Sequence, residues 1–463
     1  MDERANTDTI AAIATPVGKA GIGIIRISGP RSLEILKKIF KPKRPIDHFK
    51  SHRLYLGHIF DPVAGMYLDE VLATYMRSPR TYTTEDVVEI NSHSGYLILS
   101  KILEVVIASG ARIARPGEFT LRAYLNGRID LTQAEAIIDL INSRSERGLH
   151  LASQQIRGSL RDKINTLRGK LLQILGQLEA AIDFPEEEDA FLDRPELTKA
   201  LSNLIPEIDR LIEAHSEKKI WIEGITTVIA GRVNVGKSSL LNRILDEQRA
   251  IVTAIPGTTR DLIESTLTID GVPVRLVDTA GIRHVADDEV EKIGLRLTEE
   301  KLKESELVLA VLDQSMPISC EDIQLLERIK HKQALLVLNK IDLPPAMDWE
   351  RALQDLPPFP TLKVSALTGE GISRLKEEIV KLVIGAEKDL LPPGIAPNLR
   401  QTKALEETRK YLENALYSIT KDAPLEISAF ELHNALDSLG EIVGQTTPEQ
   451  ILENIFGRFC IGK

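Results

Sequence analysis

The sequence predicts a multidomain protein of the α/β plus α class, in which an α/β domain is inserted into a discontinuous helical domain behind a small α+β N-terminal domain. The chain has 463 residues, which is too long for one ordinary core. Helical periodicity lies on both sides of residues 224–385, where short apolar strands alternate with helical stretches. Insertion of one domain into another explains this order most simply.

Composition places the chain among globular proteins, with 43% hydrophobic and 27% charged residues. Two cysteines, Cys320 and Cys460, argue against a disulfide framework or a structural zinc site and favour a reducing, cytoplasmic location. The acidic N-terminus does not resemble a signal peptide, and no apolar run reaches the roughly 18 residues of a membrane span. A net charge of −10 argues against indiscriminate binding to a phosphate backbone.

The first 125 residues form the predicted α+β domain. Residues 9–28 are typical of strands around a glycine-rich bend, and strand-like segments alternate with turn signals to about residue 92. One helix is expected near residues 94–109.

Residues 126–223 and 386–463 form the two predicted halves of the helical domain. A helical period starts at about residue 131 and breaks at Phe184-Pro185, before an acidic run that we expect to be a solvated loop. A proline-rich linker at 390–397 precedes further helical periods. Thr447-Pro-Glu-Gln450 predicts a capping box with proline at the first helical position, and Gly457 predicts a helix end.

Residues 224–385 form the predicted α/β domain, with a mostly parallel sheet. Its expected strands are Ile225–Ala230, Val274–Val277, Val308–Leu312 and Leu335–Leu338. The first strand runs directly into Gly231-x-x-x-x-Gly236-Lys237-Ser238, and a helical segment follows. This context is typical of a phosphate-binding loop, in which backbone N–H groups surround the phosphates, Lys237 meets the β and γ oxygens and Ser238 binds Mg²⁺.

Three further motifs follow in the order of a GTPase. Asp278-Thr-Ala-Gly281 ends a strand, where Asp278 can bind Mg²⁺ through water and the Gly281 amide can touch the γ-phosphate. Asn339-Lys340-Ile-Asp342 ends another, and a carboxylate at Asp342 can accept hydrogen bonds from guanine N1–H and the 2-amino group, which adenine lacks. Ser365-Ala366-Leu367 fits the loop over the base. The sequence therefore predicts a Ras-like P-loop GTPase domain.

The hydrolytic arrangement differs from that of Ras-like proteins, because Ile282 stands where those proteins carry the glutamine that orients water. Residues 256–261 lie where the first switch loop is expected, and Thr259 is the candidate for the second Mg²⁺ hydroxyl. Arg260 is either an arginine finger or an ion-pair partner of Asp261.

The motifs at 231–239, 257–261 and 278–283 resemble those of the Era/MnmE branch of translation-associated GTPases. Segments outside them decide the branch, and they are similar to the MnmE (TrmE) family of tRNA modification GTPases over essentially the whole chain. They are Ala14-Thr-Pro-x-Gly18, Gly21-x-Gly-Ile-x-Arg-Ile-Ser-Gly29, Arg115-Pro-Gly-Glu-Phe119, Leu131-x-Gln-Ala-Glu-Ala136 and Phe459-Cys-Ile-Gly-Lys463.

The resemblance implies a folate-binding, dimerising N-terminal domain (1–125), a helical domain (126–223 and 386–463) and an inserted GTPase domain (224–385). It also implies a homodimer that works with an MnmG-type, FAD-carrying flavoprotein in a heterotetramer or larger assembly. Together they add an aminomethyl-type group, such as carboxymethylaminomethyl, to C5 of the wobble uridine (U34) of certain tRNAs. The carbon comes from a tetrahydrofolate derivative, in the 5-formyl or 5,10-methylene form.

The resemblance further implies that K⁺ acts where an arginine finger otherwise would. Its matching positions are Asn234, Thr253, Ile255 and Thr258, and the first of these is otherwise interpreted as a turn residue. The water-orienting glutamate matches Glu291, with Glu289 as the alternative because the preceding loop has one extra residue. Glu291, Lys237 and Asp278 are thus the expected catalytic residues, and Ser238 and Thr259 the Mg²⁺ ligands. The expected GTP-binding residues are Asn234, Val235, Gly236, Lys237, Ser238, Ser239, Thr253, Ala254, Ile255, Pro256, Gly257, Thr258, Thr259, Asp278, Thr279, Ala280, Gly281, Asn339, Lys340, Asp342, Ser365 and Ala366.

The folate positions of the family correspond to Arg26, Glu89, Arg128 and Lys463. Without the family, the first three are interpreted as a strand-end charge, an exposed strand acid and a turn cation. Cys460 is either a small buried hydrophobe or a chemically engaged thiol that takes part in modification.

Two other functions compete with this interpretation. A regulatory or ribosome-assembly GTPase would act as a switch without modification chemistry, but the RNA-binding KH module typical of one, with its Gly-x-x-Gly loop, is not found at the C-terminal side. A dinucleotide enzyme using Gly21-x-Gly23 is disfavoured because Arg26 occupies the third glycine position of that fingerprint.

Overall fold

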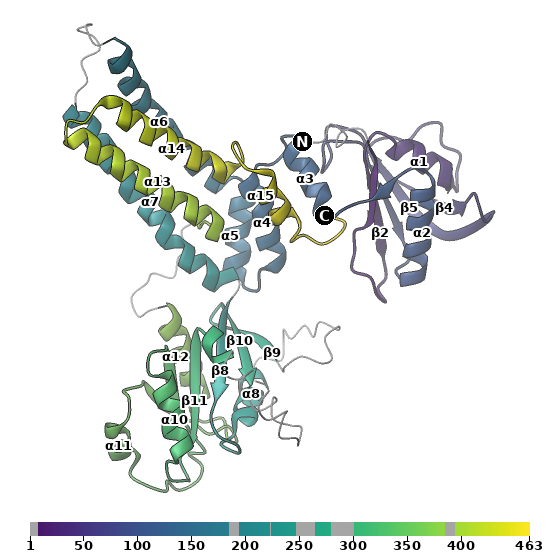
Figure 1. Ribbon diagram of the computed structural model, residues 1–463. Coiled ribbons are helices and arrows are strands. Elements are labelled where there is room, and N and C mark those ends of the chain that lie inside the picture. Colours follow the sequence, from purple (N-terminus) through teal and green to yellow (C-terminus); the bar gives the residue numbers. More distant parts are fainter. Residues whose placement is uncertain (1–7, 185–193, 223, 247–263, 279–300, 385–393) are drawn as a thin grey trace. The chain divides into compact units, whose positions relative to one another are not determined.

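The computed structural model describes residues 8–184, 194–222, 224–246, 264–278, 301–384 and 394–463 (Figure 1). The chain forms two compact units. One comprises Met1–Ile138, Gln154–Asp209 and Arg400–Lys463, and the other comprises Asp139–Ser153 and Arg210–Leu399. The predicted class is confirmed, because one sheet-containing domain precedes helices and a second, mostly parallel sheet. The residue boundaries of the three predicted domains stay a prediction.

The first unit contains a seven-stranded sheet of order β3-β4-β5-β6-β2-β1-β7, in which only the β1–β7 pair is parallel. The strands are β1 (Ile10–Ile13), β2 (Gly23–Ser28), β3 (Phe40–Pro42), β4 (Arg53–Asp61), β5 (Met66–Met76), β6 (Val87–Ser92) and β7 (Arg112–Ile113). Helices α1 (Ser32–Ile39) and α2 (Tyr96–Ala108) bury their apolar side chains against one face. Helix α2 confirms the helix expected near residues 94–109, whereas α1 and α3 (Glu118–Leu125) were not predicted.

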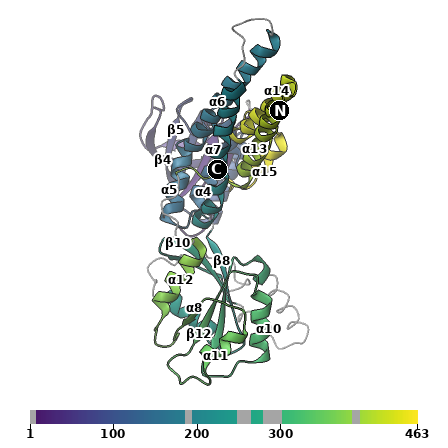
Figure 2. The same ribbon diagram turned by 90° about the vertical axis from the view of Figure 1, so that its left-hand side faces the viewer.

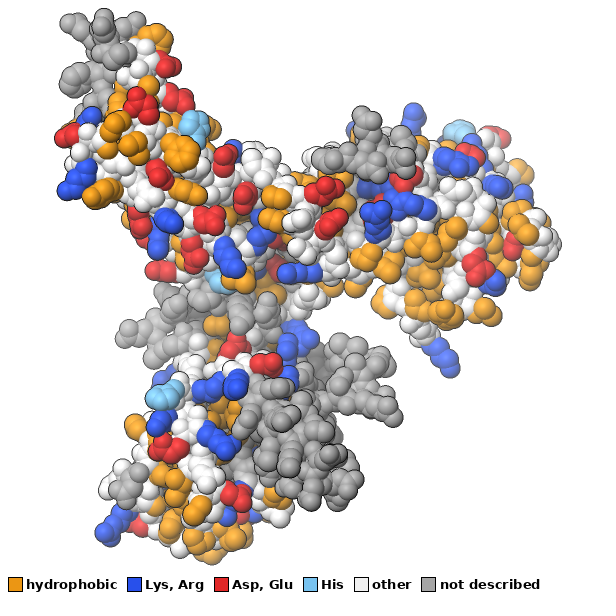
Figure 3. All heavy atoms as spheres, viewed as in Figure 1, with side chains coloured by type: hydrophobic (Ala, Val, Ile, Leu, Met, Phe, Trp, Pro, Cys, Tyr) orange, Lys and Arg blue, Asp and Glu red, His pale blue; other side chains and the backbone are white. Residues whose placement is uncertain are grey.

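The other face of this sheet carries a row of opposed residues. Leu54 lies opposite Thr74, Thr74 opposite Glu89, and Glu89 opposite Arg26. Opposed residues of neighbouring strands point to the same side, so the predicted folate residues Arg26 and Glu89 share a face with Leu54. Leu54, Leu56 and Leu72 are exposed by 57%, 42% and 41% on this side. Figure 3 shows hydrophobic side chains gathered on the surface of this domain.

Further helices precede and follow the second sheet in the sequence. They are α4 (Leu131–Asn142), α5 (Glu146–Ile156), α6 (Ser159–Asp183), α7 (Arg194–Ile222), α13 (Leu399–Thr420), α14 (Leu425–Val443) and α15 (Glu449–Phe456). Helices α6, α7, α13 and α14 lie side by side in Figures 1 and 2. Helix α6 buries one stripe of apolar residues and ends at Asp183, where the sequence predicted a break. None of the helices in the described ranges is both long and apolar enough to span a bilayer.

The predicted capping box at Thr447 is wrong. Helix α15 begins at Glu449 with Pro448 as its N-cap residue, one position later than the motif required. The Thr447 hydroxyl instead donates to the backbone oxygen of Glu441 at the end of α14, 3.3 Å away. The hydroxyl thus donates to a carbonyl of another helix, whereas in a capping box it would accept from a backbone N–H of its own helix. The predicted helix end at Gly457 is confirmed.

The second unit contains a six-stranded sheet of order β13-β12-β11-β8-β10-β9, parallel except for the β9–β10 pair. The strands are β8 (Ile225–Ala230), β9 (Glu264–Ile269), β10 (Val272–Asp278), β11 (Leu307–Asp313), β12 (Ala334–Asn339) and β13 (Thr361–Lys363). The four predicted strands are thus confirmed as β8, β10, β11 and β12.

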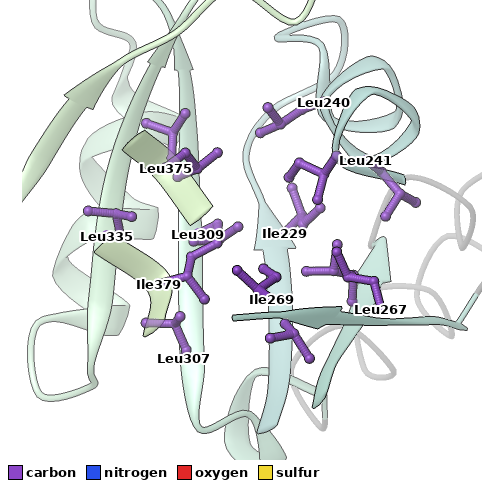
Figure 4. Close-up of a cluster of buried hydrophobic side chains, with 14 of the residues drawn as sticks. Ile229, Leu240, Leu241, Leu267, Ile269, Leu307, Leu309, Leu335, Leu375 and Ile379 are labelled. Atoms are coloured by element: carbon purple, nitrogen blue, oxygen red, sulfur yellow. The ribbon is translucent and has the colours of Figure 1, made fainter. Parts of the chain in front are cut away.

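Helices cover both faces of this sheet, as expected of parallel strands. Helices α8 (Lys237–Asp246) and α12 (Ile372–Ile384) pack on one face, where Leu240, Leu241, Leu375 and Ile379 meet the strands (Figure 4). Helix α10 (Cys320–Ile329) packs on the other through Leu326 and Ile329. A short helix, α11 (Trp349–Ala352), and the 3₁₀ turn Leu353–Asp355 follow β12. The carboxyl ends of the parallel strands therefore meet at one edge, which is where ligand sites of such sheets lie.

Candidate functional site

The loop after β8 has the backbone that a phosphate-binding loop needs. Gly231, Asn234 and Gly236 have φ angles of +156°, +65° and +95°. A Cβ atom at Gly236 would lie 2.3 Å from Nδ2 of Asn339, and one at Gly231 would lie 2.4 Å from the backbone oxygen of Val311. Glycine is therefore required at both positions, and asparagine is among the residues that tolerate a left-handed conformation.

Lys237 begins α8 and is only 6% exposed. Its Nζ donates to the backbone oxygens of Gly231 and Arg232, at 2.8 and 2.7 Å. The ammonium group thus lies across the loop that the phosphates of a nucleotide would occupy. Ser238 follows in the first turn of the helix, where a hydroxyl and the positive end of the helix dipole suit an Mg²⁺-bound phosphate.

One buried side chain joins three of the predicted motifs. Asn339 ends β12 and is 1% exposed. Its Nδ2 donates to the backbone oxygen of Val235 at 2.8 Å, and its Oδ1 accepts from the backbone N–H of Ala366 at 3.0 Å. The phosphate loop, the Asn339–Asp342 motif and the Ser365–Leu367 loop therefore form one structure.

The predicted guanine-binding carboxylate is held by a neighbouring hydroxyl. The Ser365 Oγ, itself fully buried, donates to Oδ1 of Asp342. The same Oγ accepts from the backbone N–H of Thr368 at 3.1 Å. Arg243 of α8 donates from Nε to the backbone oxygen of Ala366 at 3.0 Å, which fixes the loop from the other side. Asp342 is exposed in the turn that follows β12.

Asp313 is a residue of this site that the motifs did not indicate. Its carboxylate is 7% exposed and pairs with Lys340 Nζ at 2.6 Å, while Lys340 has a φ angle of +66°. Burial raises the pKa of Asp313, but the Lys340 ammonium and the two donors of Ser315 outweigh it, so the pKa is lowered overall. A signal was present in the sequence, because Asp313 ends an apolar strand as Asn339 does, and the two residues are opposed in the sheet.

Several predicted residues lie outside the described part of the chain. They are Thr253, Ala254, Ile255, Pro256, Gly257, Thr258, Thr259, Arg260, Thr279, Ala280, Gly281, Ile282, Glu289 and Glu291. Asp278 is described as the end of β10, level with Ile229 of β8 in the parallel register, and therefore beside the strand that leads into the phosphate loop. Within the described ranges no group of three or more His, Cys, Asp or Glu residues could hold a metal ion.

A second candidate site lies on the sheet of the first unit. Arg26 donates from Nε to Oε1 of Glu89 at 2.8 Å, and both side chains are 23% exposed. Its Nη1 donates to the backbone oxygen of Gly462 at 3.2 Å. Gly462 has a φ angle of +98°, and a Cβ there would lie 2.5 Å from the backbone oxygen of Ile13. The segment that carries half-buried Lys463 is therefore packed against the sheet beside Arg26.

Tyr82 connects Arg26 with Arg128. The ring centroid of Tyr82 lies 5.7 Å from Cζ of Arg26 and 4.9 Å from Cζ of Arg128. Arg128 Nη1 also donates to the backbone oxygen of Tyr82 at 2.6 Å. The structure thus brings the predicted folate residues Arg26, Glu89 and Arg128 together around a tyrosine that no motif of the sequence marks.

The buried interpretation of Cys460 is wrong, because this side chain is exposed. Its neighbour Phe459 takes the buried position instead, at 6% exposure, and stacks on Phe456 with ring centroids 5.8 Å apart. The apolar anchor of this segment is therefore aromatic, and the thiol is accessible.

Comparisons with known proteins cover nearly the whole chain. A family model described as the MnmE helical domain matches residues 131–460, and one described as the GTP-binding protein TrmE N-terminus matches residues 9–128. The tRNA modification GTPase MnmE of Thermoanaerobacter pseudethanolicus is 46% identical over 459 residues, which cover 98% of this chain and 99% of that protein. The protein of the same name from Syntrophus aciditrophicus is 45% identical over 456 residues, with 98% and 99% covered. Among solved structures, the G domain of the T. maritima FeoB iron transporter is 27% identical, covers 34% of this chain and 98% of its own, and has a TM-score of 0.27.

Proposed function

Because the chain belongs to the MnmE family of tRNA modification GTPases, we propose that it is the K⁺-dependent GTPase of a complex that modifies C5 of the wobble uridine (U34) in certain tRNAs. It is a GTP hydrolase that acts in tRNA modification. The group added is carboxymethylaminomethyl or aminomethyl, and its carbon comes from a 5-formyl or 5,10-methylene tetrahydrofolate. The domains are those predicted above, with the GTPase domain at residues 224–385.

The observation that best supports GTP hydrolysis is the pair of hydrogen bonds made by Asn339, which joins the phosphate loop to the base-binding segments. Lys237 neutralises the β and γ phosphates, and Asp342 accepts from the guanine edge. Ser238, Thr259 and Asp278 would hold Mg²⁺, which would supply charge neutralisation at the phosphates. Glu291 orients the attacking water.

The K⁺ site of this proposal is formed by Asn234, Thr253, Ile255 and Thr258. Its support among described residues is Asn234, whose left-handed backbone lies in the phosphate loop itself. We expect GTP hydrolysis to be faster in KCl than in NaCl at equal ionic strength, and Asn234→Ala to remove most of the difference. Equal rates of the unaltered protein in both salts would contradict the K⁺ proposal and leave GTP hydrolysis standing.

The folate site of this proposal comprises Arg26, Glu89, Arg128 and Lys463. Glu89 can accept from the N–H groups of a pterin, and the cations suit the carbonyl and carboxylate groups of the ligand. Titration of 5-formyltetrahydrofolate into the protein should give saturable binding that is lost on deletion of Lys463.

In cells, Asp278→Ala should abolish the uridine modification, measured by mass spectrometry of tRNA nucleosides. Normal modification in that strain would contradict the proposed function in tRNA modification.

The proposed assembly is a cytoplasmic homodimer that binds tRNA and an MnmG-type flavoprotein carrying FAD, in a heterotetramer or larger complex. Leu54, Leu56 and Leu72 are exposed on the open face of the N-terminal sheet, which is the face away from α1 and α2. They support dimerisation through a second copy of this face.

The exposed thiol of Cys460, close in sequence to Gly462, is compatible with a part in the modification chemistry. The second candidate function, a regulatory GTPase without modification chemistry, predicts no folate binding and is separated by the same titration.

A further inference from the structure

An open hollow of about 500 Å³ lies in the N-terminal domain, beside the loop that follows β5. The residues of its lining that matter here are His52, Arg80, Thr81, Tyr82, Asn126 and Arg128. They come from the end of the β4–β5 hairpin, from the loop before β6 and from the turn after α3. The hollow thus adjoins the second candidate site through two shared residues, Tyr82 and Arg128.

The lining of this hollow is basic. It contains two arginines and a histidine, and no acidic side chain. The nearest acids of the loop are engaged elsewhere: Glu85 accepts from Ser28 Oγ at 2.6 Å and pairs with buried Arg122 at 3.0 Å. Asp86 accepts from the Tyr75 hydroxyl and the backbone N–H of Ser78, both at 2.9 Å.

Arg80 is the residue of this hollow whose guanidinium group is available to bind a ligand. Its side chain is exposed at the rim of the hollow, and within the described residues it has no ion-pair or hydrogen-bond partner. Arg128 uses Nη1 for the backbone oxygen of Tyr82, which fixes the position of its guanidinium group. A planar guanidinium held in this way suits a carboxylate, because it can donate two parallel hydrogen bonds.

The wall of the hollow is preformed. Thr81 Oγ1 donates to the backbone oxygen of Glu85 at 2.6 Å, and Asn126 Nδ2 donates to that of Thr83 at 2.7 Å. The hydroxyl groups of Tyr82 and Thr120 are hydrogen-bonded at 2.9 Å. The loop therefore has little conformational freedom left to lose when a ligand binds.

We propose that this hollow binds the γ-glutamyl tail of the folate, with Arg80 and Arg128 pairing with its α-carboxylates. The inference rests on the proposed folate function and extends it to the form of the ligand. A pterin at Arg26 and Glu89 directs the rest of the molecule past the Tyr82 ring, because both guanidinium groups lie against that ring. Each added glutamate brings one more carboxylate, and an open, basic hollow accepts a tail of variable length. The protein thus selects polyglutamylated folate.

The test is calorimetric titration of the full chain with the monoglutamate and the pentaglutamate of 5-formyltetrahydrofolate at low ionic strength. The pentaglutamate should bind about three- to tenfold more tightly, which is the range for two exposed charge pairs. This preference should shrink at high salt. Arg80→Ala should reduce this preference for the pentaglutamate, and Arg80→Lys should restore part of it. Arg44→Ala, an exposed arginine of the same domain outside the hollow, should leave it unchanged.

Three results would overturn the inference, and they are distinguishable. Equal affinity of the unaltered protein for both ligands would remove the tail site and leave the folate proposal intact. A second result would be that Arg80→Ala keeps the preference for the pentaglutamate but no longer binds tRNA in a parallel titration. That result would assign Arg80 to RNA binding. Binding of neither ligand would remove the folate function and the tail site together. Circular dichroism of each variant separates these outcomes from misfolding.

Discussion

Asn339 and Val235 are joined by a 2.8 Å hydrogen bond from the side-chain amide to the backbone oxygen of the phosphate loop. The two residues lie 104 positions apart in the sequence. Since the amide is buried and both its polar atoms are paired, loss of either bond leaves an unsatisfied group, at a cost of about 1–3 kcal/mol. The base-binding and phosphate-binding segments therefore cannot move independently without breaking this contact.

Gly236→Ala should destabilise the GTPase domain and weaken nucleotide binding. A left-handed alanine costs about 1–2 kcal/mol, and its Cβ would also displace the Asn339 amide, so the free energy of unfolding should fall by about 3 kcal/mol. Gly271→Ala is the matched control, because Gly271 has a φ angle of +83° and a Cβ there would meet nothing within 4 Å. Urea unfolding and titration with a fluorescent GDP analogue measure both effects. Equal losses in the two variants would show that the contact with Asn339 is unimportant.

Asp342→Asn should change the nucleotide preference of the protein from guanine to xanthine. In the proposed function the carboxylate accepts two hydrogen bonds from guanine, each worth about 1.5–3 kcal/mol, so GTP affinity should fall about 10²- to 10⁴-fold. Xanthine presents a carbonyl oxygen in place of the 2-amino group, and the asparagine amide can donate to it. Competition binding with GTP and xanthosine triphosphate tests this, with exposed Glu350→Gln as the control. Unchanged GTP affinity in the asparagine variant would argue that Asp342 does not contact the base.

The Asp313–Lys340 pair should make stability depend on pH in the acid range. The pKa of Asp313 is lowered from its ordinary value of 3.8 in the folded protein, so the pair stabilises the fold above that pH. The contribution is lost as the pH falls through the lower, folded-state pKa. At pH 7, Asp313→Asn should reduce the free energy of unfolding by about 1–3 kcal/mol.

A double-mutant cycle with Lys340→Met isolates the interaction. Its coupling energy should be present at pH 7 and should decline in measurements that extend below about pH 4. A coupling energy that stays constant over this range would show that the carboxylate of Asp313 does not titrate with the pair.

Leu56→Glu should dissociate the proposed homodimer into monomers. Leu56 lies opposite Leu72 on the open face of the N-terminal sheet, and a carboxylate there would be desolvated in a dimer without a partner. Sedimentation velocity over a range of protein concentrations measures the change. Leu97→Glu, at an exposed leucine of α2, is the matched control. Identical sedimentation of both variants and the parent chain would exclude this face as the dimer contact.

The GTPase sheet could be predicted from the sequence because its central strands are continuous apolar runs that end in polar motifs. Strand β8 spans the predicted Ile225–Ala230 without change, and the glycine after it marks the loop. Each of the phosphate and base motifs is a short continuous stretch of sequence, so the chemistry of each could be inferred locally. Only their joining through Asn339 needed the structure.

The N-terminal site could not be predicted in the same way. Tyr82 contacts Arg26, Thr120 and Arg128, which come from separate parts of the chain, and no local sequence pattern marks it.

The predicted capping box at Thr447 was wrong for a similar reason, because the hydroxyl donates to a carbonyl that is distant from the motif. The buried alternative for Cys460 failed because it rested on the usual burial of cysteine, whereas the adjacent Phe459 fills the apolar position.

The bond from Arg26 to the backbone oxygen of Gly462 spans 436 positions of the chain. On the ribosome, every described partner of the phosphate loop, up to Ala366, is therefore made long before this bond can form. A polypeptide released between these points would carry the nucleotide-binding domain without the contact between Arg26 and Gly462. The order of synthesis thus lets the capacity to bind nucleotide arise before the contact between Arg26 and Gly462 can form.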